Sequence, residues 1–410
     1  MTNIKKKRGN LPLDKVASFW SIGGSIFAMF FGAGNTIFPL ILGVQNHFHP
    51  IAAACGIIVT AVLVPFLGLL GIILYSGDYK KFFFEIGKIP GYGLIILILL
   101  LIGPLAGIPR AIAVSHSTLV SLNADLGLSL PLFSFICCLL IFAFSWKLSK
   151  LLQWLGYFFT PIMLGSLAWM LLKGFILKST NPSVTIVPPA ASLSFYDGIR
   201  VGFNTMDLIA SFFFCSIVLT SLRQIANQSD TPLKGTSDLP IGKRTTILLM
   251  KGSLVTITLL AVIYFSFTTI AAKHAYAIQD VAPSGILGAL SKLTLGKNGL
   301  ITGVGVFAAC LTTEIALAGI FSRFLQTTVF AKRNVSYHAT LVLTLIPSFL
   351  ISVLNFENIC RLIGPLLSLC YPALIGLTIG NILHKLFNFK YSYMFFYGIL
   401  LISICTKLFF

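Results

Sequence analysis

The stretch FAMFFGAGNTIFPLILG, residues 27–43, lies inside the first long apolar segment of the chain and contains Gly32, Gly34, Asn35 and Pro39. Glycine and proline weaken a helix, and asparagine is unfavourable in hydrocarbon. Two interpretations are open for this stretch. Small residues can let a neighbouring helix pack closely, or the helix can be broken in the middle of a membrane. Asn35 and Pro39 favour the break.

The composition is typical of a helical membrane protein. The 410 residues are 57% hydrophobic and 10% charged, whereas a soluble domain carries about 25% charged residues. The mean hydropathy is +0.95, and apolar runs of roughly 20 residues, enough to cross a bilayer, recur along the chain. We expect membrane spans at residues 17–44, 51–76, 91–123, 131–149, 154–176, 197–222, 245–272, 300–328, 336–354, 360–383 and 391–409.

The charge of the chain is explained by its topology. There are 29 Lys and Arg against 11 Asp and Glu, a net charge of +18. With the spans placed as above, twenty cations fall in connections or near span ends on one side of the membrane and eight on the other, and only Arg110 lies deep inside a span. The positive-inside rule then predicts a cytoplasmic N-terminus. We expect a lipid bilayer around the protein and no nucleic-acid partner.

Motifs of enzyme chemistry are missing from the sequence. There is no zinc-protease, phosphate-loop, CxxC or nucleophile-elbow pattern. The eight cysteines fall in or beside the expected spans and indicate apolar packing rather than disulfides or a metal site. We therefore expect no enzyme and no cofactor.

The chain is expected to form one transmembrane domain, residues 1–410. The connection at residues 175–196 divides it into two runs of five spans, residues 17–176 and 197–383, and leaves an additional helix at 391–409. This connection and those at 223–244 and 273–299 are expected to be loops, because they are rich in Pro, Ser, Asn and Gly.

The first span of each run is interrupted, at Gly34-Asn35-Thr36 and at residues 202–207. An odd number of spans makes the second run start from the opposite face of the membrane. Broken helices at corresponding positions of such an inverted repeat are the best sequence indication of a transporter binding site.

A few polar residues inside the spans are candidate functional groups. Asp207 and Glu314 are the only acids deep inside the spans, and intramembrane acids are usually functional, the alternative being a structural partner for another polar group. Arg110 could pair with either acid as a gate, form a static ion pair, or extend toward the outer interface. The hydroxyls of Thr312 and Thr313 are hard ligands that suit an alkali cation, but threonine in a membrane helix also bonds its own backbone.

Five segments resemble one known family, the branched-chain amino acid transport system II carriers of the LIVCS group. They fall in order in spans 1, 3, 6, 8 and 10: FFGAGNTIFPLILG (30–43), IGPLAGIPRAIAVS (102–115), GFNTMDLIAS (202–211), ACLTTEIALA (309–318) and LLSLCYPALIG (366–376). The resemblance implies an all-α polytopic membrane protein with a LeuT-type 5+5 inverted repeat and discontinuous helices 1 and 6. It also implies uptake of leucine, isoleucine and valine with sodium or protons across a bacterial inner (plasma) membrane.

The family resemblance also implies site residues. Substrate would be bound by Gly32, Ala33, Gly34, Asn35, Asn204, Thr205, Met206, Asp207 and Leu317, together with apolar groups of spans 3 and 6. A sodium ion would be bound by the carbonyls of Ala28, Phe31 and Ala309 and the hydroxyls of Thr312 and Thr313.

The chain departs from the family pattern in three places. It has eleven spans where the family has twelve, Glu314 where the family has a small residue, and Ser115-His116-Ser117 where the family has an acid. Sodium and protons are therefore both open as the coupling ion, and Arg110, Asp207 and Glu314 are candidate gate residues or proton carriers. The same fold could instead carry another amino acid or an amine. A channel would be expected to show rings of pore residues and no paired helix breaks.

Overall fold

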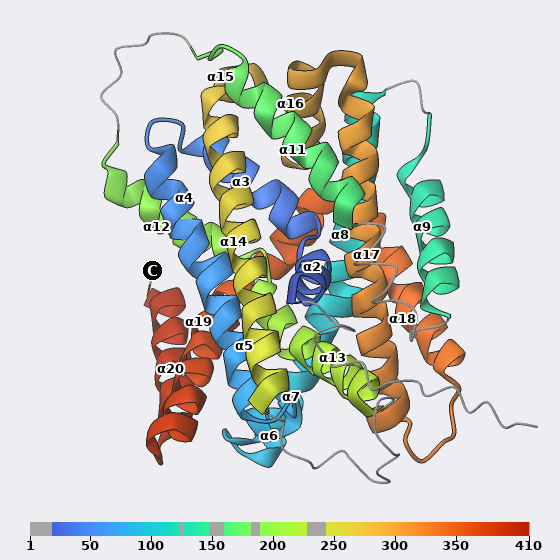
Figure 1. Ribbon diagram of the computed structural model, residues 1–410, viewed down its shortest axis with the longest axis vertical. Helices are drawn as coiled ribbons and strands as arrows, with labels where there is room; N and C mark the ends of the chain where they lie inside the picture. Colours follow the sequence, from blue (N-terminus) through green and yellow to red (C-terminus); the bar gives the residue numbers. More distant parts are fainter. Residues whose placement is uncertain (1–18, 124–126, 147–159, 182–188, 228–242, 410) are drawn as a thin grey trace, which may run out of the picture.

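The computed structural model describes residues 19–123, 127–146, 160–181, 189–227 and 243–409 (Figure 1). Every regular element in this part of the chain is a helix. The helices are α2 (Phe19–Phe30), α3 (Ala33–Gln45), α4 (Pro50–Ile58), α5 (Val64–Leu74), α6 (Tyr79–Phe84), α7 (Lys88–Leu100), α8 (Gly107–Leu122), α9 (Leu130–Ser145), α11 (Thr160–Ile176), α12 (Ala191–Phe203), α13 (Asp207–Asn227), α14 (Lys243–Lys273), α15 (Ala275–Ile278), α16 (Ile286–Leu295), α17 (Leu300–Phe324), α18 (Tyr337–Ser352), α19 (Phe356–Phe387) and α20 (Ser392–Phe409). The π-helical turns η1 (Val59–Leu63) and η2 (Leu101–Leu105) join α4 to α5 and α7 to α8, and η7 (Leu325–Val329) extends α17.

The two expected broken helices are present. Helices α2 and α3 meet at an angle of 70°, and α12 and α13 meet at 45°. The first break lies at Phe31 and Gly32, earlier than the expected Gly34-Asn35-Thr36, and α3 continues through Pro39. Gly32 is extended, with φ −125° and ψ −155°, and a Cβ on it would lie 2.9 Å from the Thr313 hydroxyl oxygen. The helix is therefore interrupted at a residue that packs against Thr313 with no room for a side chain.

The second break is a short turn between α12 and α13. The N–H groups of Asn204, Thr205 and Met206 bond to carbonyls three residues back. Met206 has a positive φ of 63°, a left-handed conformation that costs a non-glycine residue roughly 1–2 kcal/mol. The tertiary structure must hold this residue in place, because its own backbone preference opposes it.

Each of the expected spans has a helical counterpart in the described part of the chain. Five helices are long and apolar enough to cross a membrane, and the two bent pairs pass the same test. The remaining positions are taken by shorter apolar helices at Leu130–Ser145, Leu164–Ile176, Tyr337–Ser352 and Ser392–Lys407. The sixth span begins earlier than expected, because α12 starts at Ala191 instead of residue 197.

The connection at residues 273–299, expected to be a loop, is largely helical. It contains α15 and α16 with short 3₁₀ turns at Pro283–Gly285 and Gly296–Gly299. Helix α16 buries Leu287 and Leu290 against the body of the protein. This packing outweighs the loop-forming residues on which the expectation rested. Several expected segments lie wholly or partly outside the described residues. They are the N-terminal segment before residue 19, the end of the fourth span, the start of the fifth, part of the 175–196 connection and most of the 223–244 connection.

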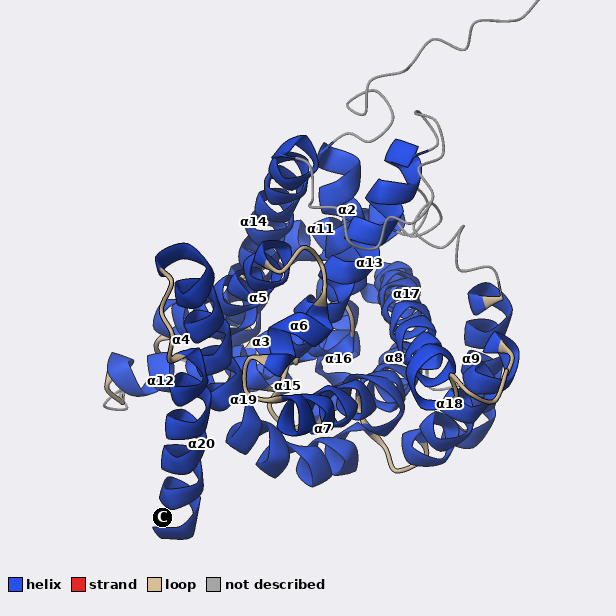
Figure 2. Ribbon diagram, turned by 90° about the horizontal axis from the view of Figure 1, so that it is seen from below, coloured by secondary structure: helices blue, strands red, loops and turns tan. Residues whose placement is uncertain are grey.

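The chain around the two breaks is buried, at residues 26–40 and 205–215, whereas the outer end of α12 reaches the edge of the molecule (Figures 1 and 2). Helix α2 contacts α14, α13 and α17, and α3 contacts α14, α4, α8 and α12. Helix α20 lies at the edge of the molecule, where it packs against α19. The interrupted backbone is thus kept away from the periphery of the protein.

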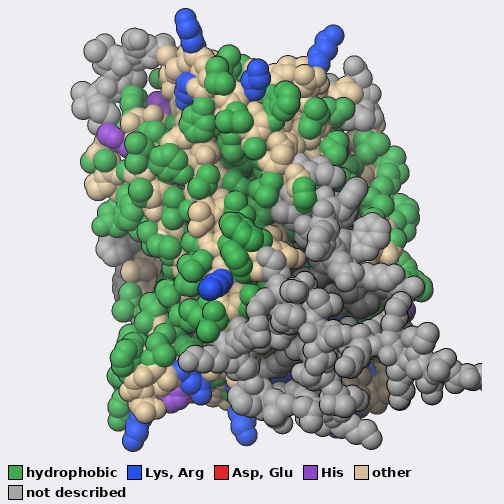
Figure 3. Space-filling view, viewed as in Figure 1, with side chains coloured by type: hydrophobic (Ala, Val, Ile, Leu, Met, Phe, Trp, Pro, Cys, Tyr) green, Lys and Arg blue, Asp and Glu red, His purple; other side chains and the backbone are tan. Residues whose placement is uncertain are grey.

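The surface agrees with a protein that lies in a bilayer. On the face drawn in Figure 3, apolar side chains cover the middle, while most Lys and Arg side chains gather at the two ends. Large apolar side chains such as Leu254, Val262 and Ile346 are more than half exposed. Such exposure is expected for side chains that face lipid tails.

Close packing between α2 and α14 depends on Gly23. A Cβ on Gly23 would lie 2.7 Å from the Gly252 carbonyl oxygen and 2.8 Å from the Cβ of Val255. The Thr256 hydroxyl donates a 2.9 Å hydrogen bond to the Gly23 carbonyl oxygen across this contact. The next residue, Gly24, has no atom within 4 Å of the position of a Cβ.

We expect Gly23→Ala to destabilise the purified protein by about 1–3 kcal/mol, because the added methyl group overpacks the α2–α14 contact. Gly24→Ala is the matched control and should be neutral or slightly stabilising, since alanine favours a helix. Thermal unfolding in detergent measures both. Equal melting temperatures for the two variants would contradict the close contact.

Candidate functional site

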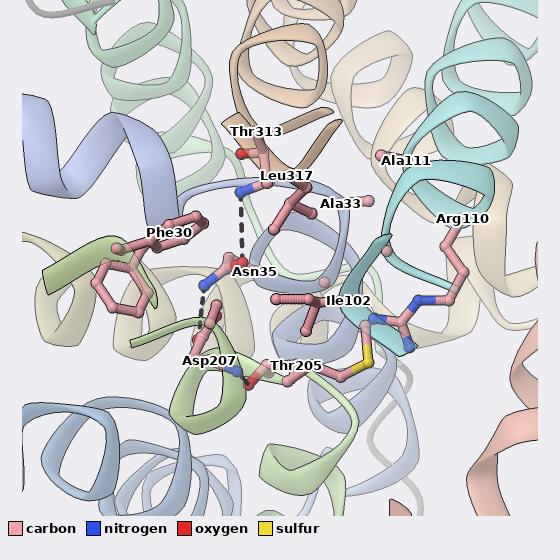
Figure 4. A pocket seen from close by; sticks show the side chains of 16 residues that line it. Phe30, Ala33, Asn35, Ile102, Arg110, Ala111, Thr205, Asp207, Thr313 and Leu317 are labelled. Atoms are coloured by element: carbon pink, nitrogen blue, oxygen red, sulfur yellow. Dashed lines mark hydrogen bonds between the residues drawn. The ribbon is translucent and has the colours of Figure 1, made fainter. Parts of the chain in front are cut away.

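A cavity lies where the two broken helices meet α8 and α17 (Figure 4). Its lining consists of Phe30, Gly32, Ala33, Gly34, Asn35, Ile102, Gly107, Arg110, Ala111, Thr205, Met206, Asp207, Ala210, Phe214, Thr313 and Leu317. The two breaks touch here, because a Cβ on Gly34 would lie 3.1 Å from the Thr205 carbonyl oxygen. The cavity volume of about 40 Å³ is room for a few water molecules, so the cavity must widen to hold an amino acid.

Three buried side chains are hydrogen-bonded beside the cavity. The Asn35 amide donates to the Asp207 carboxylate at 2.8 Å and to the Tyr264 hydroxyl at 2.5 Å, and that hydroxyl donates to the same Asp207 oxygen at 2.9 Å. Asn35 is on α3, Asp207 begins α13, and Tyr264 is on α14. The triangle therefore joins both broken helices to a continuous one, and it supplies Asp207 with donors at a depth where lipid has none.

The second halves of the two broken helices, α3 and α13, differ in the hydrogen bonds at their N-termini. At α13, the Leu208 N–H donates to the Tyr371 hydroxyl at 3.0 Å, and the Asp207 N–H donates to the Thr205 hydroxyl at 3.4 Å. At α3, the Asn35 side-chain oxygen accepts from the Gly32 N–H at 3.3 Å.

The next two N–H groups of α3, those of Ala33 and Gly34, belong to residues that line the cavity. The first N–H groups of a helix have no acceptor within the helix. Of the two broken helices, α3 is therefore the one whose first N–H groups are at the cavity wall without a side-chain acceptor among the described residues, and a helix N-terminus suits an anion.

A second set of oxygens lies between α2 and α17. The Thr312 hydroxyl is 2.7 Å from the Ala309 carbonyl oxygen and 3.2 Å from that of Ala28. The Thr313 hydroxyl is 3.3 Å from the carbonyl oxygens of Ala309 and Met29. Hydroxyl and carbonyl oxygens are the ligands that hard cations prefer. Four of the five residues expected to bind a cation are thus together, and Met29 joins them.

Phe31 is the fifth residue of that expected set. Its N–H group donates to the Phe27 carbonyl oxygen at 2.7 Å, so the last turn of α2 extends to it. Its side chain is fully buried and stacks on Phe27. No contact of its carbonyl oxygen with either threonine is recorded, so its place as a ligand stays a prediction.

Arg110 lines the cavity but makes no ion pair with Asp207 or Glu314 among the described residues. The expected gate between Arg110 and one of these acids is therefore not formed in this conformation. The guanidinium carbon lies 5.5 Å from the centre of the Phe38 ring, a cation–π contact.

Glu314 lies away from the cavity and outside the set of oxygens around Thr312 and Thr313. It is 1% exposed, and its carboxyl group is close enough to the thiols of Cys137, Cys138 and Cys310 to act on them electrostatically. Cys137 and Cys138 belong to α9, which packs on α17. A role for Glu314 as gate or proton carrier stays a prediction.

Most residues expected to bind substrate line the cavity. They are Gly32, Ala33, Gly34, Asn35, Thr205, Met206, Asp207 and Leu317, and Asn204 is the exception. The apolar groups expected from spans 3 and 6 include Ile102, Ala111, Ala210 and Phe214. Sequence reasoning assigned no role to Tyr264 or Tyr371, although Tyr371 lies in one of the segments that resemble the family.

Comparisons with known proteins agree with this arrangement. A family model described as "Branched-chain amino acid transport protein" matches residues 15–409. The chain is 27% identical over 351 residues to the branched-chain amino acid permease BrnQ of Corynebacterium glutamicum, which covers 84% of this chain and 76% of that protein. It is 28% identical over 333 residues to the branched-chain amino acid transport system 3 carrier protein of Pseudomonas aeruginosa, covering 80% and 72%.

Solved structures give the fold. A Na⁺-coupled sialic acid symporter superposes with a TM-score of 0.59 at 11% identity over 98% of this chain and 93% of that one. Mhp1, a nucleobase-cation-symport-1 family transporter, superposes with a TM-score of 0.55 at 14% identity over 95% and 92%. The expected LeuT-type fold with discontinuous helices 1 and 6 is thereby confirmed.

The relatives by sequence are named as permeases and carriers, so the expectation of a transporter rather than an enzyme is also confirmed. The match of the family model runs over nearly the whole chain and agrees with the five segments in which the resemblance was first seen. The chain therefore belongs to the family of branched-chain amino acid transport proteins.

Proposed function

We propose that this protein is a cation-coupled symporter that carries leucine, isoleucine and valine into the cell by alternating access. The observation that carries the proposal is the cavity enclosed by both broken helices, with backbone donors of α3 on its wall and the Asp207 carboxylate beside them. An amino acid needs both kinds of group, because it presents a carboxylate and an ammonium a few ångströms apart.

The proposed substrate pose uses the polar and apolar parts of the lining separately. The carboxylate meets the N–H groups at the start of α3, while the ammonium meets Asp207 and the carbonyls of the α12–α13 turn. The branched side chain lies among Phe30, Phe214 and Leu317, where Phe30 and Phe214 pack edge to face at 5.2 Å. Apolar enclosure of this kind favours aliphatic side chains over polar ones.

The proposed coupling ion is sodium, bound between α2 and α17. Its ligands are the carbonyls of Ala28, Phe31 and Ala309 and the hydroxyls of Thr312 and Thr313. An ion there joins a broken helix to a continuous one, and so stabilises the conformations in which these helices are in contact. Protons are the alternative coupling ion. In that case the first candidate for the proton carrier is Asp207, which lines the cavity, and the second is Glu314.

We also propose that the protein lies in the bacterial inner (plasma) membrane with its N-terminus in the cytoplasm. The distribution of Lys and Arg between the connections supports this orientation. The single-domain division, with repeats at residues 17–176 and 197–383 and an additional helix at 391–409, is part of the same proposal. The alternatives are a carrier of another amino acid or an amine on this fold, and a channel.

We expect proteoliposomes with an imposed sodium gradient to accumulate labelled leucine above the outside concentration, with saturation and with competition by isoleucine and valine. A proton gradient without sodium tests the other coupling ion. Flux that never exceeds equilibrium would indicate a channel. If isoleucine and valine did not inhibit the uptake, and only other amino acids or amines did, the proposed substrate class would be wrong.

Thr313→Ala should raise the sodium concentration for half-maximal uptake by about tenfold, because the ion loses a ligand worth roughly 1.5 kcal/mol. The matched control is Thr327→Ala, an exposed threonine in η7, which extends the same helix. Protein abundance should be similar in both variants. Unchanged sodium activation in Thr313→Ala would remove this residue from the ion site.

Asp207→Asn should abolish accumulation, since the amide cannot supply the negative charge that faces the ammonium. Asp197→Asn, at an exposed position of α12, is the control and should accumulate leucine normally. The measurement is initial uptake per reconstituted protein. Near-normal uptake by Asp207→Asn would make this residue a structural partner of Asn35 and Tyr264.

A further inference from the structure

Arg110 carries a buried positive charge with no anion among the described residues in direct contact, and Asp207 acts on it only electrostatically, from its own place on the cavity wall. The residue lies in α8, is 3% exposed, and its Nε atom has no hydrogen-bond partner. No ion pair in the described part of the chain includes it. Burying an unpaired charge is costly, and a charge in a membrane span usually faces a partner or a cavity.

The groups that touch the guanidinium are neutral. Phe38 offers its ring face at 5.5 Å, and the Cys360 thiol of α19 lies against the guanidinium. The nearest acid on that helix is Glu357, three residues before Cys360, and one of its oxygens already accepts a 3.0 Å hydrogen bond from the Ser284 N–H. These contacts hold the side chain in position without neutralising it.

The carboxylate of Asp207 lies at the side of the cavity opposite Arg110. Asp207 and Arg110 both line it, with Ile102 drawn between them (Figure 4). Asp207 is hydrogen-bonded to Asn35 and Tyr264 rather than to Arg110. Two opposite charges therefore face one small space without pairing, which is the arrangement that a zwitterion between them would complete.

We propose that Arg110 binds the α-carboxylate of the substrate, together with the N–H groups at the start of α3, while the ammonium lies toward Asp207. This inference rests on the proposed function. A guanidinium matches a carboxylate in shape and can donate two parallel hydrogen bonds to it. A carboxylate has acceptor sites for these and for backbone donors as well.

The proposal narrows the substrate class to α-amino acids with a free carboxylate. A branched amine or an amino-acid amide would leave the Arg110 charge unpaired in the closed cavity. A site that loses the partner of a buried charge discriminates strongly against such an analogue. On this proposal, amines do not share the site.

The test compares leucine with leucinamide, which keeps the ammonium and the side chain but lacks the negative charge. Binding to the purified full chain in detergent is measured from the concentration dependence of thermal stabilisation. In the wild-type protein, leucine should bind and leucinamide should not. In Arg110→Gln, leucine should lose about 10- to 100-fold in affinity, while leucinamide should bind about as well as leucine. Arg110→Lys keeps the charge without the fork, and should lie between the two.

Three further experiments separate substrate binding from a structural or gating role. Without ligand, Arg110→Gln should unfold at the same temperature as the wild-type protein or higher, because an unpaired buried charge has been removed. The matched control is Arg323→Gln, an exposed arginine of α17, which should keep the wild-type preference for leucine. Glu357→Gln should also keep that preference, since Glu357 is not the partner of Arg110.

The inference would be wrong if the Arg110→Gln protein still preferred leucine over leucinamide by the wild-type factor. The same holds if Glu357→Gln lost that preference to the same extent, because Arg110 would then act through a gate with Glu357. Failure of the wild-type protein to bind leucine at all would instead contradict the proposed function. The two failures are thus distinguishable.

Discussion

Interrupted backbone in the middle of a bilayer is the constraint on which this structure depends. Lipid offers no hydrogen-bond partner, so every N–H and carbonyl freed by a break must meet protein or line a cavity. The hydroxyls of Thr312 and Thr313 meet the carbonyls of Ala28 and Met29, and the Tyr371 hydroxyl meets the Leu208 N–H. Helices α17 and α19 thereby fix the breaks in α2–α3 and α12–α13.

The presence of the breaks could be predicted from the sequence, whereas their boundaries could not. Asn and Asp are rare in apolar runs, so Asn35 and Asp207, with glycines nearby, indicate the places near which a helix ends. Pro39 was counted toward the first break, yet α3 continues through it. What decides the boundary is the approach of Gly32 to Thr313 from a helix far away in sequence. The α16 helix was missed for a similar reason, because its packing is tertiary.

The sequence also did not show in which direction each side chain points around its helix. Glu314 follows Thr313 directly, but successive residues on a helix point about 100° apart. Thr313 faces the cavity while Glu314 lies near the cysteines of α9. Tyr264 and Tyr371 gave no signal of their own, since a tyrosine in an apolar span resembles ordinary packing. Only the structure brings their hydroxyls to Asp207 and Leu208.

Thr313 is where ion and substrate can act on each other in the proposed mechanism. Its hydroxyl is in the oxygen set between α2 and α17, and the same side chain lines the cavity beside Gly32. An ion that orders this threonine also fixes Gly32, and Gly32 precedes the α3 N–H groups that face the cavity. Occupation of one site therefore reduces the cost of ordering the other, and reciprocity requires substrate to strengthen ion binding by the same factor. Symport needs this coupling between the two sites, and the coupling requires no contact between the ion and the amino acid.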